Sequence, residues 1–196
     1  MHLLMQKTSN VYEWIKKEES RGKTLMALNQ PLTAKQLAKR TGIPMDSCSY
    51  TIAKLTAKGL TTCLNPQARN SRLYWITEPG RRCRKKLHQD INLPYREHDL
   101  PSVNWALYGW LCYSHRAAII RIFTEPMQPS EIKRTLRIHK PNVKISANNI
   151  RDVLKLLLEK GIVQKVFVRK KAHPRYELTD SGKQFRELLI QSEMAF

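Results

Sequence analysis

The sequence has 196 residues, 41% of them hydrophobic, and its 35 Lys and Arg residues against 16 Asp and Glu give a formal net charge of +19. This length suits one or two small domains with packed cores, and no apolar run is long enough to predict a membrane-spanning helix. Residues 1–95 hold 17 cations and 6 acids, and residues 96–196 hold 18 and 10. We therefore expect nucleic acid as the partner and no membrane, because an anionic membrane surface would favour a basic amphipathic helix and none stands out.

An apolar helical stretch opens the first half of the chain and ends near Leu28. Pro31 breaks it, because proline removes a backbone donor and clashes with the preceding turn. Thr33 is the expected N-cap of a short polar helix over residues 34–41. The sequence Gly42-Ile43-Pro44 then predicts a turn.

The next helix is predicted over residues 46–58, with Asp46 or Ser47 as its N-cap. Apolar side chains at helical spacing define its buried face: Cys48, Ile52 and Leu55. Gly59 is expected to end the helix in the left-handed conformation.

Two short strands are predicted after this helix, over residues 60–64 and 73–77. A polar hairpin loop, Asn65–Arg72, joins them. Thr77 is then the expected N-cap of a last helix, with Glu78 in the first turn, where the helix dipole favours an acid.

The second half of the chain repeats this order. Residues 55–87 align with residues 157–189 without a gap, and Pro31 upstream matches Pro126. The identical residues of the aligned block, in first-half numbers, are Leu55, Lys58, Gly59, Tyr74, Thr77, Gly80, Arg84 and Leu87. The second copy is longer near His139–Ser146. The period is far longer than that of a solenoid repeat, so we infer a duplicated domain.

The second copy therefore predicts a helix over residues 148–160 and strands over residues 162–168 and 175–179. Ile150, Leu154 and Leu157 form the buried face of that helix. A basic hairpin loop joins the strands, and Thr179 caps the last helix with Asp180 behind it.

Helix, helix, turn, helix, two-stranded hairpin and helix is the order of a winged helix-turn-helix domain. We therefore predict a mainly α-helical α+β protein with small β-hairpin wings, built as two tandem winged helix-turn-helix domains that arose by duplication. The first domain is predicted at residues 1–90, the linker at residues 91–102 and the second domain at residues 103–196.

The residues that end the third helix and open the last one resemble MarR-type and related winged-helix regulators. They are Leu55 with Lys58-Gly59-Leu60, the basic hairpin, and Ile76-Thr77 with Gly80. The resemblance covers residues 12–87 and 108–189, and it implies a DNA-binding regulator. Those regulators carry one such domain per chain, act as dimers and usually have an acidic-x-Arg pattern near the wing tip, where this chain has Asn65–Arg69.

In this fold the third helix enters the major groove and the wing approaches the backbone or the minor groove. The side chains expected to face outward from the two third helices and contact bases are Ser47, Ser49, Tyr50, Lys54, Asn148, Asn149, Arg151 and Lys155. The wing cations expected to contact phosphates are Arg69, Arg72, Arg169, Lys170, Lys171 and Arg175. Asn and Arg make bidentate contacts to adenine and guanine, so the second copy is expected to discriminate bases better.

Structural roles compete with several of these contacts. Asn148 or Asn149 is equally suited to be an N-cap, and Tyr50 has the alternative of packing on a neighbouring helix. The charge run Arg81–Lys86 fits a solvated helix face as well as it fits DNA contact. The aromatic segment Val103–Phe123 is interpreted as core.

The sequence offers little for catalysis, so we predict no enzyme, no cofactor and no metal site. The six histidines have no HExxH or comparable spacing, no glycine-rich phosphate loop is present, and the four cysteines lack CxxC spacing. Asp90, Glu97, His98 and Asp99 are interpreted as parts of a polar linker. The N-terminal residues lack a signal-peptide core, and the cysteines fit a reducing compartment, so a cytoplasmic, nucleoid-associated location is expected.

The leading hypothesis is a sequence-specific double-stranded DNA-binding protein that acts as a transcriptional regulator. One chain would then cover two adjacent half-sites of different sequence. Two alternatives remain open: a plasmid- or phage-type replication initiator with paired winged helices, and a winged-helix scaffold that binds protein or RNA. The N-terminal and C-terminal helices are available either for a homodimer contact or for packing within one chain.

Overall fold

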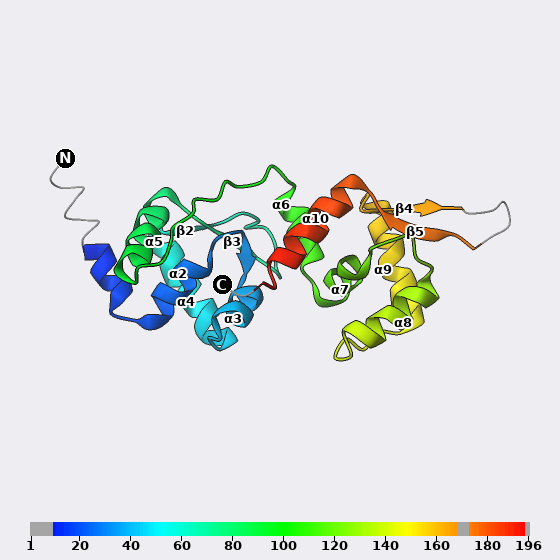
Figure 1. Ribbon diagram of the computed structural model, residues 1–196, viewed down its shortest axis with the longest axis horizontal. Helices are drawn as coiled ribbons and strands as arrows, with labels where there is room; N and C mark the ends of the chain where they lie inside the picture. Colours follow the sequence, from blue (N-terminus) through cyan, green and yellow to red (C-terminus); the bar gives the residue numbers. More distant parts are fainter. Residues whose placement is uncertain (1–9, 168–172, 195–196) are drawn as a thin grey trace. The chain divides into compact units, whose positions relative to one another are not determined.

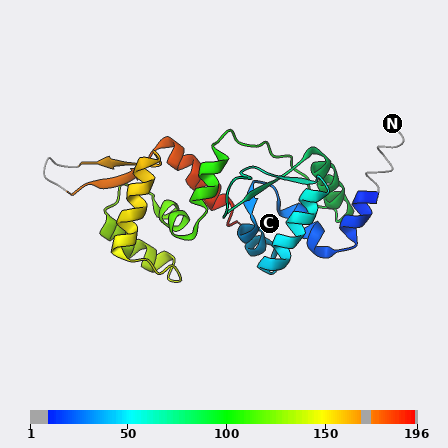
Figure 2. The same ribbon diagram turned by 180° about the vertical axis from the view of Figure 1, so that it is seen from behind.

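The computed structural model describes residues 10–167 and 173–194, and their fold is mixed α+β, with small antiparallel sheets. The chain divides into two compact units (Figures 1 and 2). The first unit extends to Trp110 and includes the segment that begins at Ser192, and the second comprises Leu111–Gln191. The predicted α+β class is therefore confirmed.

The first unit consists of helices with one short strand among them, then a hairpin, then two helices. After helical residues 10–16, its elements are α2 (Glu19–Ala27), β1 (Leu32–Thr33), α3 (Ala34–Thr41), α4 (Met45–Ala57), β2 (Thr61–Cys63), β3 (Leu73–Ile76), α5 (Glu78–Asp90) and α6 (Trp105–Leu111), which crosses the boundary in sequence. The strands form an antiparallel sheet in the order β1-β3-β2, with Leu32 opposite Tyr74. Residues 91–104 between α5 and α6 contain no helix or strand.

The second unit repeats the order of α2, α3, α4, β2, β3 and α5. Its elements are α7 (Ser114–Ile122), α8 (Pro129–His139), α9 (Ala147–Glu159), β4 (Val163–Val166), β5 (Arg175–Leu178) and α10 (Asp180–Gln191). β4 and β5 are antiparallel, and Met127 forms an isolated bridge with Tyr176. In the sequence alignment Met127 corresponds to Leu32 and Tyr176 to Tyr74, so this bridge matches the β1–β3 pair of the first unit.

The predicted buried faces of the two third helices, α4 and α9, are confirmed. Each of the six side chains is at most 1% exposed: Cys48, Ile52, Leu55, Ile150, Leu154 and Leu157. In the first unit they pack with Leu25, Leu37 and Trp75. Complete burial of one Leu or Ile side chain contributes roughly 1.5–3 kcal/mol, so these stripes orient both helices and decide which residues face solvent.

Two of the predicted helix ends in the first unit are confirmed. The Gln36 N–H donates to Thr33 Oγ1 at 3.2 Å, and the Thr33 N–H donates to Gln36 Oε1 at 2.8 Å, which makes a capping box at the start of α3. Gly59 has φ of 71°, the left-handed conformation that ends α4 without steric cost.

The predicted N-cap of α4 was wrong. The helix begins at Met45, and Pro44 takes the N-cap position with φ of -53° and ψ of 144°. The Pro44 carbonyl accepts the N–H of Cys48 at 2.8 Å, so the first turn starts before Asp46 and Ser47. Proline is tolerated at this position because the start of a helix does not use the backbone N–H that proline lacks.

The N-cap of α9 is Ser146, whose hydroxyl accepts the N–H of Asn149 at 3.1 Å. The alternative role of Asn148 or Asn149 as the cap is therefore wrong. Both asparagine side chains are exposed in the first turn of the helix.

Two arginines hold the C-terminal end of α2. Arg84 of α5 is 4% exposed and donates to the Leu28 carbonyl at 3.2 Å, and Arg40 of α3 donates to the Ala27 carbonyl at 3.0 Å. Carbonyls at a helix C-terminus carry partial negative charge, which favours a nearby cation. Arg84 therefore does not share the surface of the run Arg81–Lys86, and the interpretation of that run as wholly solvated was wrong at this residue.

The predicted helical stretch that ends near Leu28 is interrupted upstream. Residues 10–16 and α2 are separated by a break at Lys17 and Glu18. The Arg21 guanidinium donates to the Trp14 carbonyl at 2.7 Å and lies over the Trp14 ring at 3.9 Å from its centroid. Through these contacts Arg21 of α2 provides a hydrogen-bond donor for a backbone carbonyl near the end of the helix over residues 10–16.

The aromatic segment Val103–Phe123 supplies buried residues to both units, as predicted, but Trp105 and Trp110 are only half-buried and Tyr113 is exposed. Tyr108 is 1% exposed in the first unit and Phe123 is 3% exposed in the second. Tyr113 is 53% exposed at the N-cap of α7, where Arg116 lies 5.3 Å from its ring centroid.

Candidate nucleic-acid interface

The outward face of α4 carries the first group of predicted base-contacting residues. Ser47 and Tyr50 are exposed, and Ser49 and Lys54 are half-buried. Tyr50 is 58% exposed, so it does not pack on a neighbouring helix. The Ser49 hydroxyl donates to the Met45 carbonyl at 2.9 Å, which leaves its lone pairs available as acceptors.

Tyr50 and Lys54 form a pair on this face. The Lys54 Nζ lies 4.2 Å from the centroid of the Tyr50 ring, one helical turn away. An exposed cation–π contact contributes roughly 0.5–1 kcal/mol, enough to favour one arrangement of the two side chains. α4 therefore presents an apolar ring, a hydroxyl and a cation together, which suits a thymine methyl group beside a phosphate.

The outward face of α9 is richer in planar polar groups. Its exposed side chains include the four predicted contacts and one acid: Asn148, Asn149, Arg151, Lys155 and Asp152. Arg151 donates to the Asn148 side-chain oxygen at 3.2 Å, which orders a guanidinium and an amide side by side. These two groups are the side chains that read guanine and adenine edges by bidentate hydrogen bonds.

The loop of the first hairpin is built around Asn65, which is 5% exposed. Its side chain accepts the N–H of Leu73 at 2.7 Å and donates to the Ser71 carbonyl at 3.2 Å. The Arg72 Nε donates to a carbonyl of the same loop, that of Ala68, at 3.0 Å. Arg69 is exposed on this ordered loop, so the structure presents a cation there on a fixed backbone.

Of the four cations predicted in the second hairpin, Arg175 lies within the described residues. Arg169, Lys170 and Lys171 lie outside the described residues. Arg175 is turned inward: it donates to the Pro126 carbonyl at 2.7 Å and forms an ion pair of 2.9 Å with Glu131 in the first turn of α8. We therefore assign Arg175 a role in joining β5 to α8 and leave it out of the proposed phosphate contacts.

Sequence reasoning missed two exposed residues of the second hairpin. The hairpin β4–β5 projects from the helices of its unit in both ribbon views (Figures 1 and 2). Lys165 is exposed on β4, and Phe167 beyond its end is 61% exposed. Lys165 shares its strand face with the buried Val163, so strand alternation gave no signal of its exposure.

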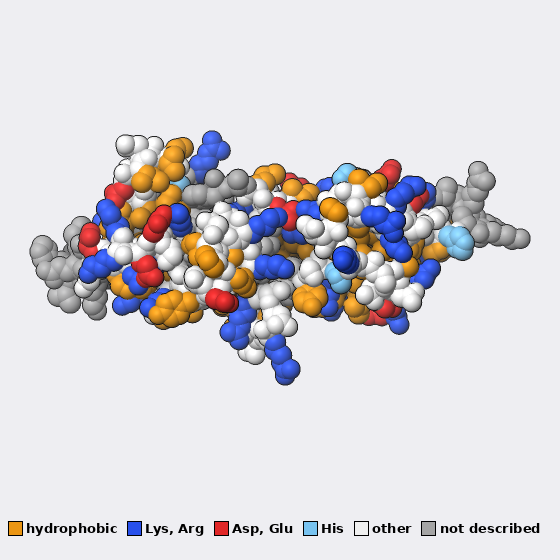
Figure 3. Space-filling view, turned by 90° about the horizontal axis from the view of Figure 1, so that it is seen from below, with side chains coloured by type: hydrophobic (Ala, Val, Ile, Leu, Met, Phe, Trp, Pro, Cys, Tyr) orange, Lys and Arg blue, Asp and Glu red, His pale blue; other side chains and the backbone are white. Residues whose placement is uncertain are grey.

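The surface of each unit carries many cations. Lys and Arg side chains are spread over the visible face of both units in Figure 3, and acidic side chains are sparser there. This distribution agrees with the cation excess of both halves of the sequence. It favours an extended anionic partner over a single anion held at one point.

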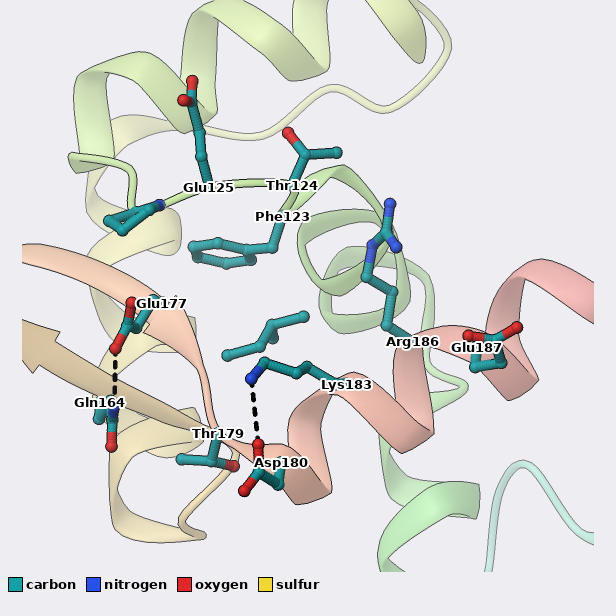
Figure 4. Close-up of a pocket in the computed structure, with 12 residues that line it drawn as sticks. Phe123, Thr124, Glu125, Gln164, Glu177, Thr179, Asp180, Lys183, Arg186 and Glu187 are labelled. Carbon is teal, nitrogen blue, oxygen red and sulfur yellow. Dashed lines mark hydrogen bonds and ion pairs between the residues drawn. The ribbon is translucent and has the colours of Figure 1, made fainter.

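A cavity of about 550 Å³ lies in the second unit, among the α7–α8 connection, the hairpin and the start of α10 (Figure 4). Four carboxylates line it: Glu125, Glu177, Asp180 and Glu187. Gln164 donates to Glu177 at 2.7 Å and Lys183 pairs with Asp180 at 3.0 Å. A lining with more carboxylates than cations repels phosphates, so this cavity is not part of the candidate nucleic-acid interface.

The described residues contain no group of three His, Cys, Asp or Glu side chains that could hold a metal ion. Burial raises the pKa of the Cys48 thiol to about 11 and also raises the pKa of Cys83, so both thiols stay protonated at neutral pH. None of the described helices combines the length and the apolar character needed to cross a bilayer.

Comparisons with family models, curated proteins and solved structures found no match.

Proposed function

We propose that this protein is a sequence-specific double-stranded DNA-binding protein, a transcriptional regulator built from two tandem winged helix-turn-helix domains. The observation that carries the proposal is the outward face of α9, where Asn148, Arg151 and Lys155 are exposed. The opposite face of this helix is buried in the core of the second unit. Such a helix follows a helix and a turn and precedes a hairpin, which is the setting of a recognition helix.

Matching hydrogen bonds support the duplication on which the proposal rests. The N–H of Leu60 donates to the Leu55 carbonyl at 3.0 Å, and the N–H of Ile162 donates to the Leu157 carbonyl at 2.9 Å. Thr77 caps α5 by accepting the N–H of Gly80 at 3.3 Å, and Thr179 caps α10 by accepting that of Gly182 at 3.2 Å. Equivalent residues thus close equivalent corners in both units, which is expected of two copies of one domain.

The proposed mode of docking places α4 and α9 in major grooves. Arg69 and Arg72 would contact phosphates from the first hairpin, and Lys165 would do so from the second. Phosphate contacts set position and base contacts set sequence preference, so α9 contributes more to specificity than α4 does. The two faces differ in their side chains, so the preferred site is asymmetric.

Selection of bound duplexes from a random pool tests this proposal. The expected result is an enriched, asymmetric duplex sequence whose affinity falls steeply as salt rises, because released counterions drive the binding of phosphates. Single-stranded DNA and RNA of the enriched sequence should compete poorly. Equal competition by RNA, or no enrichment at any salt concentration, would reject sequence-specific duplex binding.

A further inference from the structure

A basic cavity lies beside the start of α9. The turn between α8 and α9, residues 140–146, is longer than the matching turn of the first unit, residues 42–44, and with α8 it lines an open cavity of about 370 Å³. Lys133 and Arg137 line it from α8, and Lys144 lines it from the turn. Among the residues that the structure describes, no carboxylate lines this cavity.

The turn that closes the cavity is held by the chain itself. The N–H of Lys140 donates to the Leu136 carbonyl at 2.9 Å, and the N–H of Val143 donates to the Lys140 carbonyl at 2.8 Å. Leu136 is 1% exposed, and Val143 and Ile145 are half-buried beside it. These hydrogen bonds and the buried Leu136 hold the turn in place beside α8.

The first unit has no equivalent of this cavity in its sequence. Lys133 and Arg137 align with Ala38 and Gly42, and the residues that carry Lys144 belong to the longer turn. The three cations and the longer turn therefore occur together only in the second copy.

We propose that this cavity binds one phosphate group. Three cations around one space without a carboxylate attract a phosphate strongly, because their fields add. The Arg137 guanidinium can pair with two phosphate oxygens at once, and the two lysines act as point charges. Ser146 caps α9 at the edge of the cavity, so the positive end of the α9 dipole adds to the same field.

The identity of the ligand rests on the proposed function: in a duplex complex the group is a backbone phosphate, whereas the same chemistry accepts free phosphate. A phosphate held here sits just before Asn148 and Asn149 in the first turn of α9. It therefore fixes how that helix enters the groove, in the way that backbone contacts set the register of base contacts.

Inorganic phosphate tests the cavity without DNA. We expect saturable changes in the amide resonances of Val143 and Ser146 when phosphate is added to the full-length protein at constant ionic strength. In the double variant K133Q/R137Q these resonances should show no saturable change. Arg134→Gln is the matched control, because Arg134 is an exposed residue of α8 that does not line the cavity. Changes that do not saturate, or that persist in the double variant, count against the site.

A second arm uses the selected duplex with single phosphates replaced by neutral methylphosphonates. At one position the replacement should weaken binding of the unaltered protein about tenfold and leave binding of the double variant unchanged. Equal effects on both proteins would mean that no backbone phosphate occupies the cavity. Phosphate binding without duplex binding would retain the site and reject the proposed function, and negative results in both arms would overturn the site itself.

Discussion

Thr77 donates a hydrogen bond of 2.6 Å from its hydroxyl to the carbonyl of Gly59, and so ties the start of α5 to the end of α4. The same hydroxyl accepts the N–H of Gly80 at 3.3 Å. Thr179 repeats the first contact with Gly161 at 2.7 Å. One side chain in each unit therefore caps a helix and closes the corner after the hairpin.

Thr77→Val should lower the free energy of unfolding by about 1–2 kcal/mol, because valine keeps the shape but removes both hydrogen bonds of the hydroxyl. Urea denaturation measures the loss, and Thr179→Val should behave in the same way. Thr62→Val is the control, since Thr62 is exposed on β2 and its change should stay within about 0.5 kcal/mol. Equal effects at Thr62 and Thr77 would contradict the capping role.

Gly80→Ala should destabilise the first unit by at least about 3 kcal/mol. A Cβ at Gly80 would lie 2.1 Å from the Leu60 carbonyl oxygen, and one at Gly182 would lie 2.2 Å from that of Ile162, so the backbone has to move in either variant. Thermal unfolding measures both losses.

Gly22→Ala provides the opposite control for the same chemical change. A Cβ at Gly22 meets nothing within 4 Å, and the residue lies inside α2. Alanine should stabilise the protein there by up to about 1 kcal/mol, because it favours the helix more than glycine does. A loss at Gly22 as large as that at Gly80 would mean that the close approach to Leu60 is not the cause.

His88 gives the first unit a sensitivity to acid. Its ring is 7% exposed, and Nδ1 lies 3.1 Å from the Pro94 carbonyl oxygen. Burial and the nearby Arg84 charge lower the pKa of His88 below its ordinary value of 6.5, against the opposing hydrogen bond to Pro94. The unfolded chain therefore binds the proton more readily. The stability that neutral His88 contributes is present above about pH 6.5 and is lost as the pH falls through the lowered pKa.

His88→Asn tests this linkage, because asparagine retains a donor for the Pro94 carbonyl and carries no charge at any pH. The variant should lose less stability than the unaltered protein between about pH 7.5 and about pH 5.5 in urea titrations. The pKa of His98 is also lowered, by burial first, so some pH dependence should remain in the variant. Identical losses in the two proteins would show that His88 does not drive the effect.

Arg151→Ala should lower affinity for the selected duplex by about ten- to a hundredfold and relax the preference at one base pair, because a bidentate contact to guanine is lost. Arg69→Ala should weaken all duplexes alike and reduce the salt slope by about one, as expected of a phosphate contact. Binding measured on the selected duplex and on single-base variants separates these outcomes. The same pattern for both substitutions would reject the division between base-reading and phosphate-binding residues.

Much of the local structure follows from the sequence. Thr33, Gly59 and Thr77 were located correctly because a cap or a left-handed glycine depends on a few neighbouring residues. Pro44 was missed as the N-cap of α4 because Asp46 and Ser47 have the side chains that usually cap, and only the position of the first turn excludes them.

The roles of individual cations do not follow from the sequence. Arg84 and Arg175 both stand in basic stretches, yet each donates to a carbonyl far away in the chain, that of Leu28 or that of Pro126. The cavity at Lys133 was missed for the same reason, since its lining comes from a helix and a separate turn.

The sequence by itself determined the order of the elements, the two buried stripes, the repeat and the excess of positive charge, because hydrophobic period, caps and composition are properties of neighbouring residues. Only the tertiary structure decided which cations face solvent and which hold the fold together. The physical reason is that a buried guanidinium needs hydrogen-bond acceptors and finds them among the groups that lie near it in the folded chain. Packing brings together residues that no local sequence pattern connects.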